Sequence, residues 1–136
     1  MKWVNRQFGD LDYDENMVIH FAEGLFGFEQ YRNFIIVHDV DSEPFRWLVS
    51  VENADLSFPM LEPGMILPGY EGHLGKDSEI WVLAALKPNV QQSTVNLRSP
   101  IVIDRRSYEG QQIILDDETL PFQFPLVPPS GATGGR

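Results

Sequence analysis

Short apolar runs separated by proline and glycine recur along most of this chain. Four of these runs are rich in β-branched and aromatic residues, which favour strands, and they span residues 17–21, 34–40, 45–51 and 80–86. No amphipathic pattern with the period of a helix continues for the ten or more residues that a helix prediction needs. Many short strands with frequent turn signals predict an all-β fold, either a sandwich or a barrel.

Alternation inside the run 45–51 predicts which face of that strand is buried. Its odd positions are all apolar, whereas Arg46 and Ser50 are polar and share the other parity. Successive side chains of a strand point to opposite faces of the sheet. We therefore expect a half-buried strand with one face in water.

A second group of short runs follows residue 93. Residues 94–103 predict two apolar strands separated by a kink at Pro100, and residues 111–115 predict a third strand after a turn. Gly110 stands immediately before this third run, as expected for a turn residue.

Two amides in this group are candidates for contact with a partner. Asn96 stands between Val95 and Leu97, so strand alternation places its side chain on the opposite face from both. Gln111 begins the next predicted strand. The two amides either contact a partner or satisfy each other across neighbouring strands. The need of buried amides for hydrogen-bond partners favours the second interpretation.

Residues 27–34 carry the only helical signal that we interpret. Phe28, Tyr31 and Phe34 recur at a spacing of three, which places them on one face of a helical turn. The segment predicts one or two short helical turns and no longer helix.

Two segments predict irregular structure. Residues 63–77 combine prolines with several glycines, which is typical of a long loop. Residues 128–136 have too few apolar groups to order themselves. We therefore expect a single domain over residues 1–126 and a flexible C-terminal tail over residues 127–136.

Composition supports a folded chain and excludes cysteine chemistry. The chain has 136 residues, of which 43% are hydrophobic, enough to bury the core of one domain. It has no cysteine, which excludes disulfides, thiolate metal ligands and cysteine nucleophiles. No run approaches the roughly 20 apolar residues of a membrane span, and the start of the chain lacks the apolar core of a signal peptide. We expect a cytoplasmic protein without membrane contact.

Charge is strongly negative and unevenly distributed. The formal net charge is −10; residues 1–68 hold 12 acidic and 4 basic side chains, and residues 69–136 hold 8 and 6. Such a field repels nucleic acid, so we expect no direct nucleic-acid binding. The acidity either keeps a small domain soluble or steers a basic protein partner.

Candidate chemistry is sparse. The acids of residues 10–15 lack the glycine and the final glutamate of a calcium loop, and the three histidines are too far apart for a metal motif. A hydrolase would need the adjacent carboxylates of Asp116, Asp117 and Glu118 in a cleft with raised pKa values, but their neighbours predict an exposed turn. We expect no enzymatic activity, no metal site and no cofactor.

Four segments resemble, in order, the sequence pattern of the FliW family of flagellar assembly factors. They are residues 21–34 (FAEGLFGFEQYRNF), 45–52 (FRWLVSVE), 58–63 (FPMLEP) and 94–115, which contains TVNLRSPIVI. Three departures stand out. Phe26 replaces a proline that the family usually has, Asp104 replaces a common asparagine, and residues 120–126 lack the tyrosine and arginine of the family pattern.

The resemblance implies a single antiparallel β-barrel-like domain with a regulatory rather than a catalytic role. Proteins of this family bind flagellin and also the RNA-binding translational repressor CsrA. Free flagellin occupies them and leaves CsrA to repress flagellin mRNA. After flagellin is exported, they bind CsrA and relieve the repression.

Contact residues are expected among exposed acids of the N-terminal half, with one aromatic anchor, because basic partners and interface aromatics favour such positions. The partner-binding candidates are Phe26, Glu29, Asp39, Asp41, Glu43, Asp55, Asn96 and Gln111. The alternative function is a β-barrel that binds a small ligand, with the loop 63–77 over its mouth.

Overall fold

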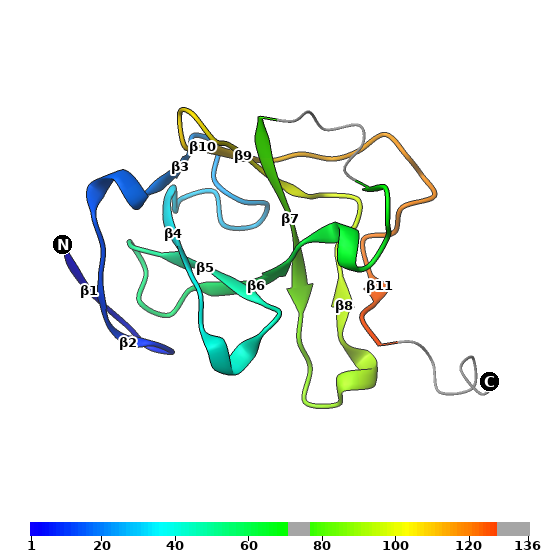
Figure 1. Cartoon of the computed structure of the whole chain (residues 1–136), viewed down its shortest axis with the longest axis horizontal. Helices are drawn as coiled ribbons and strands as arrows, with labels where there is room; N and C mark the ends of the chain where they lie inside the picture. The colour runs from blue at the N-terminus through cyan, green and yellow to red at the C-terminus, as the bar shows by residue number, and fades with distance from the viewer. Residues whose placement is uncertain (71–76, 128–136) are drawn as a thin grey trace.

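Seven strands close into a barrel in the computed structural model, which describes residues 1–70 and 77–127 (Figure 1). Around the barrel, each strand pairs with the next, and β9 returns to β7. In this order the strands are β7 Ser78–Ala85, β6 Ser57–Leu61, β5 Arg46–Ser50, β4 Asn33–Val37, β3 Ile19–Phe21, β10 Glu109–Gln112 and β9 Ile101–Asp104.

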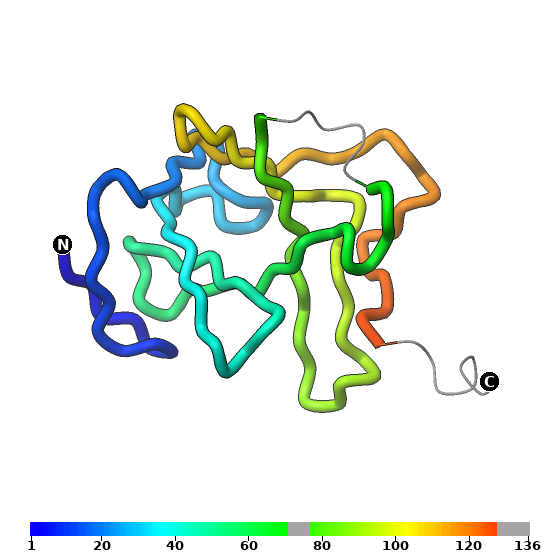
Figure 2. Tube along the Cα trace, in the orientation of Figure 1, coloured from blue at the N-terminus to red at the C-terminus, as the bar shows by residue number. Residues whose placement is uncertain are grey.

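Four further strands lie outside the closed ring. β1 Lys2–Asn5 and β2 Gly9–Asp12 form a separate antiparallel hairpin. β8 Thr94–Val95 continues the edge of β7 beyond β9, and β11 Phe124–Pro125 pairs with β8. The hairpin and β11 lie at opposite ends of the long axis (Figure 2).

Closure of the barrel depends on one parallel strand pair. The pairs recorded for the described residues are antiparallel except that of β3 and β10, which matches Glu109 with His20 and Gly110 with Phe21. This parallel contact extends over only two residue pairs. Beyond Phe21 the chain turns away from β10 through Gly24, whose φ of +67° is a left-handed conformation that suits glycine.

The barrel interior is filled by apolar side chains. Strand alternation sends one parity of each barrel strand inward, which places Phe21 and Phe34 in edge-to-face contact with ring centroids 5.4 Å apart. The buried members of this interior core are Ile19, Phe21, Leu25, Phe34, Leu48, Met60, Trp81, Ile101 and Ile103. A barrel of this size leaves room for side chains rather than for a channel.

The outer face of the barrel is covered by two further apolar clusters. At one end, Ile35 and Val49 pack against Tyr13 and against partly buried side chains of the β1–β2 hairpin. At the other end, Val82 and Leu97 belong to a cluster that also includes side chains from β11 and the segment before it. Most barrel strands are therefore buried on both faces over part of their length.

The predicted all-β barrel is confirmed, and helical structure in the described residues is limited to short 3-10 turns. These turns are η1 Glu15–Met17, η2 Val40–Ser42, η3 Pro63–Met65 and η5 Val90–Gln92. Instead of the expected helical turns over residues 27–34, the chain forms tight turns up to residue 30, with hydrogen bonds from Phe28 N to Leu25 O and from Tyr31 N to Phe28 O, and residues 33–34 already belong to β4.

The prediction of one wet face on β5 is wrong. Leu48 and Ser50 share the parity that we expected in water, and both are fully buried. Leu48 faces the barrel interior, while the Ser50 hydroxyl accepts hydrogen bonds from Glu52 N and Asn53 N. The sequence pattern did not show that the β1–β2 hairpin covers the other face.

Two predicted irregular segments fall partly outside the described residues. In the predicted loop 63–77, residues 71–76 are outside the described residues. In the predicted tail 127–136, residues 128–136 are outside them. No helix within the described residues is long and apolar enough to span a membrane.

Gly110 should be the least replaceable glycine of the barrel. A Cβ atom at this position would lie 2.5 Å from the Phe21 ring and 2.9 Å from Ile19, although the backbone conformation of Gly110 is not left-handed. We expect Gly110→Ala to lower the free energy of unfolding by about 3 kcal/mol through overpacking. Urea denaturation measures this loss.

Gly9→Ala is the matched control, because nothing lies within 4 Å of its Cβ position and only its φ of +72° opposes a side chain. Its cost should be about 1 kcal/mol. Equal losses in the two variants would contradict the role of Gly110 in barrel closure.

Candidate functional site

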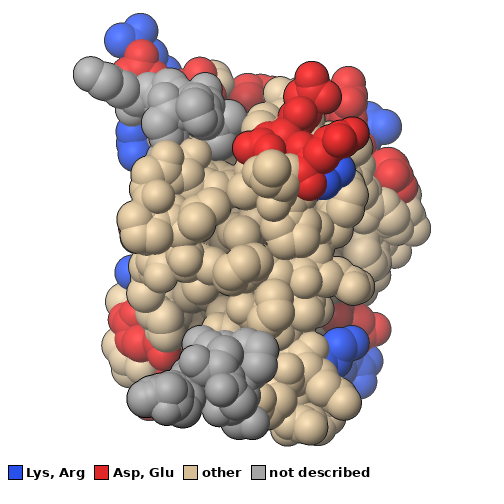
Figure 3. All heavy atoms as spheres, turned by 90° about the vertical axis from the view of Figure 1, so that its right-hand side faces the viewer, with Lys and Arg blue, Asp and Glu red and all other residues tan. Residues whose placement is uncertain are grey.

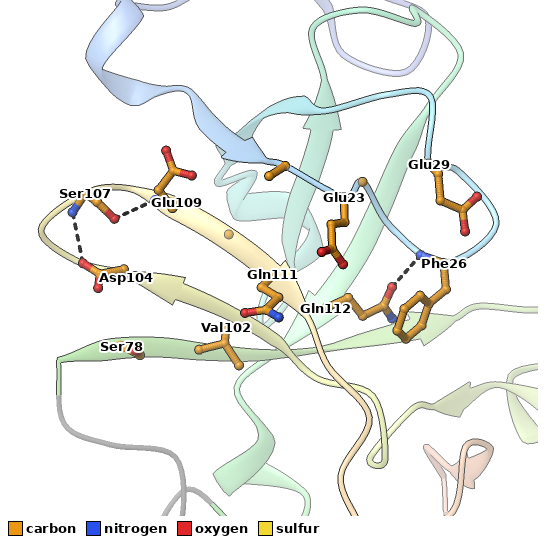
Figure 4. A pocket seen from close by; sticks show the side chains of 13 residues that line it. Glu23, Phe26, Glu29, Ser78, Val102, Asp104, Ser107, Glu109, Gln111 and Gln112 are labelled. Carbon is orange, nitrogen blue, oxygen red and sulfur yellow. Dashed lines mark hydrogen bonds between the residues drawn. The ribbon is translucent and has the colours of Figure 1, made fainter.

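An open groove lies where β3 and β10 separate. Its volume is about 690 Å³. Residues of the 22–29 loop form one wall, and residues of β9 and β10 with Ser78 of β7 form the other (Figure 4). The groove exists because the parallel pairing of β3 with β10 ends at Gly110, while β10 continues to Gln112.

The groove is lined by acidic side chains. Glu23 and Glu29 come from the loop, Asp104 from the end of β9 and Glu109 from the start of β10, and all four are exposed. No Lys or Arg is among the described residues that line it. The side chains that line the groove therefore present negative charge, and the charge of Arg106, which is not a lining residue, has only a minor effect on Asp104.

Backbone hydrogen bonds hold two of these carboxylates in their charged forms. Asp104 Oδ1 accepts from Ser107 N at 3.0 Å and from Arg106 N at 2.8 Å, and these bonds lower the pKa of Asp104. Glu29 Oε2 accepts from Gly27 N at 3.0 Å, which lowers the pKa of Glu29. A lowered pKa keeps a carboxylate ionised even at a pH below its usual titration range, so both groups are anionic at neutral pH.

A buried amide joins the two walls. Gln112 Oε1 accepts a hydrogen bond from Phe26 N at 2.9 Å, and Gln112 Nε2 donates to Ser99 O at 3.2 Å. Gln112 is only 9% exposed. Proline, usual at position 26 in the family pattern described above, has no N–H, so the bond to Gln112 depends on this departure.

Phe26 is fixed at the rim of the groove. Its backbone is held by Gln112, yet its side chain is 48% exposed beside the groove (Figure 4). Apart from Phe26, the groove walls offer few apolar side chains. A large exposed aromatic beside charged walls is a typical anchor for a protein partner.

Three of the eight predicted contact residues lie in this groove: Phe26, Glu29 and Gln111. Gln111 is exposed on β10, where its backbone pairs with Val102. Asn96 lies elsewhere and is partly buried. Its Oδ1 accepts from Ser99 N at 2.9 Å, so its carbonyl stabilises the turn before β9 and not Gln111.

The other predicted acids are on separate surfaces. Asp39, Asp41 and Glu43 surround η2 between β4 and β5, where Asp39 Oδ1 accepts from Asp41 N. Glu43 contacts His38 and Arg46, and chiefly the hydrogen bond with His38 lowers its pKa. Asp55 forms an ion pair with Arg6.

Sequence reasoning missed four groove residues: Glu23, Asp104, Glu109 and Gln112. Strand alternation can indicate exposure of Glu109 and burial of Gln112, which are three positions apart and therefore on opposite faces. This inference about Glu109 is possible only if Glu109 belongs to the strand, and the predicted strand began at position 111.

The structure gives no support to two rival functions. Asp116, Asp117 and Glu118 are exposed, and Asp117 Oδ1 accepts from Thr119 N in a turn rather than lining a cleft. The barrel interior, which a small ligand would occupy, is filled by the core described above. Within residues 1–70 and 77–127, no three His, Asp or Glu side chains converge as a set that could hold a metal ion.

A second, uncharged surface lies away from the groove. The side of the molecule that carries η3, β8 and β11 shows a broad area without charged side chains, with acidic and basic side chains at its margin (Figure 3). Met65 in η3 and Phe122 before β11 are both exposed. Arg98 lies over the Phe122 ring, 4.8 Å from its centroid.

Comparisons with known proteins agree on one family. The sequence model of the FliW protein family matches residues 2–126. The flagellar assembly factor FliW of Caldicellulosiruptor saccharolyticus is 34% identical, covering 90% of this chain and 88% of its own. FliW of Caldanaerobacter subterraneus is 31% identical, covering 93% of each chain. A crystal structure of the flagellar assembly factor FliW matches with a TM-score of 0.85 and 26% identity, covering 96% of this chain and 99% of that chain.

Gln112→Met should loosen the loop that carries Phe26. The change removes the acceptor of Phe26 N and the donor to Ser99 O while keeping a side chain of similar size. We expect a loss of about 2 kcal/mol in the free energy of unfolding, because buried polar groups lose their partners. Amide exchange at Phe26, followed by NMR, should become faster.

Gln111→Met is the matched control on the neighbouring exposed position. Its effect should stay within about 0.5 kcal/mol. Unchanged exchange at Phe26 in the Gln112 variant would show that the amide does not hold the loop.

Proposed function

This chain belongs to the FliW family of flagellar assembly factors, and we propose that it acts by binding flagellin and the translational regulator CsrA in turn. While flagellin occupies the protein, CsrA remains free to repress flagellin mRNA. After flagellin is exported, the protein binds CsrA and relieves the repression. In this proposal the protein works in the cytoplasm and catalyses no reaction.

The observation that carries the proposal is the open acidic groove with Phe26 at its rim. Its carboxylates suit a basic protein, because complementary charges accelerate association and suppress wrong partners. CsrA is such a partner, since it binds RNA. The net charge of −10 supports the antagonism too, because the field around the bound protein opposes the approach of RNA.

The test is a pair of titrations with flagellin and CsrA from the same organism, followed by competition. Binding to both partners, with one displacing the other, is the expected result. Binding to flagellin alone would limit the protein to flagellin assembly, and binding to neither would remove the proposed mechanism.

Association with CsrA should depend strongly on salt. The screening length falls from about 30 Å at 0.01 M to about 3 Å at 1 M ionic strength, so steering by exposed carboxylates is lost over this range. We expect the association rate constant to fall by about tenfold or more, as stopped-flow fluorescence can measure. The dissociation rate constant, measured in the same experiment, should change much less. An association rate that does not respond to salt would contradict electrostatic steering.

A further inference from the structure

Phe26 is displayed by a loop whose shape is tightly constrained. A Cβ atom on Gly24 would lie 2.5 Å from the Glu29 Cα, so the two ends of the loop touch through backbone atoms. Within the loop, Phe28 N donates to Leu25 O, and Leu25 is buried in the barrel interior. Together with the bond from Phe26 N to Gln112, these contacts fix the backbone that carries the exposed ring before any partner arrives. A rigid aromatic loses little conformational entropy on binding.

On the other wall of the groove, the carboxylates of Glu109 and Asp104 stand on neighbouring strands and repel each other. β9 and β10 pair Gly110 with Ile103 and Gln111 with Val102, and the same antiparallel register brings Glu109 opposite Asp104. Like charges directly opposite on neighbouring strands are destabilising. Glu109 and Gln111 lie two positions apart and face the same side, at a separation of about 7 Å along the strand. A cationic side chain placed here would relieve the repulsion between Glu109 and Asp104.

The groove is shaped for a chain segment rather than for a small molecule. It is open along its length, and its walls consist mainly of polar and charged groups, whereas small-molecule sites are enclosed and mostly apolar. The one large apolar group, Phe26, lies at one end, and Asp104 and Glu109 lie at the other (Figure 4). An occupant must therefore offer separate apolar and cationic groups along its length.

We propose that this groove is the docking site for an extended segment of the basic partner, with an apolar side chain against Phe26 and Lys or Arg side chains beside Glu23, Asp104 and Glu109. The inference rests on the proposed function, and it assigns the groove to CsrA and not to flagellin. Charge complementarity decides between the two, since only CsrA must present a cationic surface to bind RNA. Phe26 supplies the local anchor, and the carboxylates guide and orient the cations.

Two groove variants test the assignment. Phe26→Ala removes the anchor, and Glu23→Lys with Glu109→Lys reverses charge at two exposed side chains for which no hydrogen bond or ion pair is recorded within residues 1–70 and 77–127. We expect Phe26→Ala to weaken CsrA affinity about tenfold, mainly through faster dissociation. The double reversal should slow association about tenfold or more at low salt, and the difference from wild type should shrink as salt is raised.

Each variant has a matched control away from the groove. Phe122→Ala removes an aromatic with the same exposed fraction of 48%, and Asp10→Lys with Glu15→Lys makes the same change in net charge at exposed positions. Both controls should bind CsrA within about twofold of wild type. Circular dichroism and urea unfolding of every variant exclude loss of the fold as the cause of weaker binding.

The outcomes separate this inference from the proposed function. Weaker CsrA binding by the groove variants alone, with flagellin affinity retained, supports the inference. CsrA binding that is unchanged, or reduced equally by the controls, overturns the assignment of the groove and leaves the proposed function standing. A loss of flagellin affinity as large as the loss of CsrA affinity also overturns it. Wild-type protein that binds neither partner removes both.

Discussion

The short parallel contact between β3 and β10 is the constraint on which the barrel and its groove both depend. At this contact only a glycine fits at position 110, because any side chain there would overlap the Phe21 ring in the barrel interior. Pairing stops after this residue, so the backbone of the loop that leaves β3 needs other hydrogen-bond partners. The Gln112 side chain supplies the link to the departing loop. The groove is thus a consequence of how the barrel closes, and its rigidity comes from the same residues.

Hydrogen bonds through the turn between β8 and β9 connect the groove wall to the segment before β11. Asn96 accepts from Ser99 N, and Ser99 O accepts from Gln112, so the turn is held from within and from the groove wall. Arg98 donates to Leu120 O at 2.6 Å and to Glu118 O at 2.8 Å. These bonds join the turn to the segment before β11, which is on the side of the uncharged surface. A buried polar network stabilises one arrangement only when each member is satisfied. Asn96, which strand alternation marks as an exception, is one such member.

Sequence patterns predicted the architecture better than the site. The runs at 34–40, 45–51 and 80–86 correspond to β4, β5 and β7, because β-branched and aromatic residues favour strands whatever covers them. The polar hairpin of β1 and β2 has no such runs and was missed. For the site, the decisive quantity is register. In residues 111–115 the apolar Ile113 and Leu115 share the parity of Gln111, so alternation points Gln111 inward. The pairing of β10 instead buries Gln112 and leaves Gln111 exposed. Glu23 and Glu109 are 86 positions apart in sequence, so their proximity to one groove follows only from barrel closure.

Local neutralisation, rather than the number of acids, decides where the negative field of this protein acts. The net charge of −10 is carried by 20 acidic residues, most of them in the N-terminal half. Asp55 already faces Arg6, and Glu43 faces Arg46, so the potential near each is reduced by its own partner. Such exposed pairs add little stability. In the groove, no Lys or Arg is among the described lining residues, and backbone N–H groups are the main reason that Asp104 and Glu29 stay ionised. The charge of nearby Arg106 is the smallest of the influences that lower the pKa of Asp104. Field lines from a concave surface also concentrate in its opening. Under the proposed function, these charges would guide a basic partner to the groove even though more acids lie elsewhere.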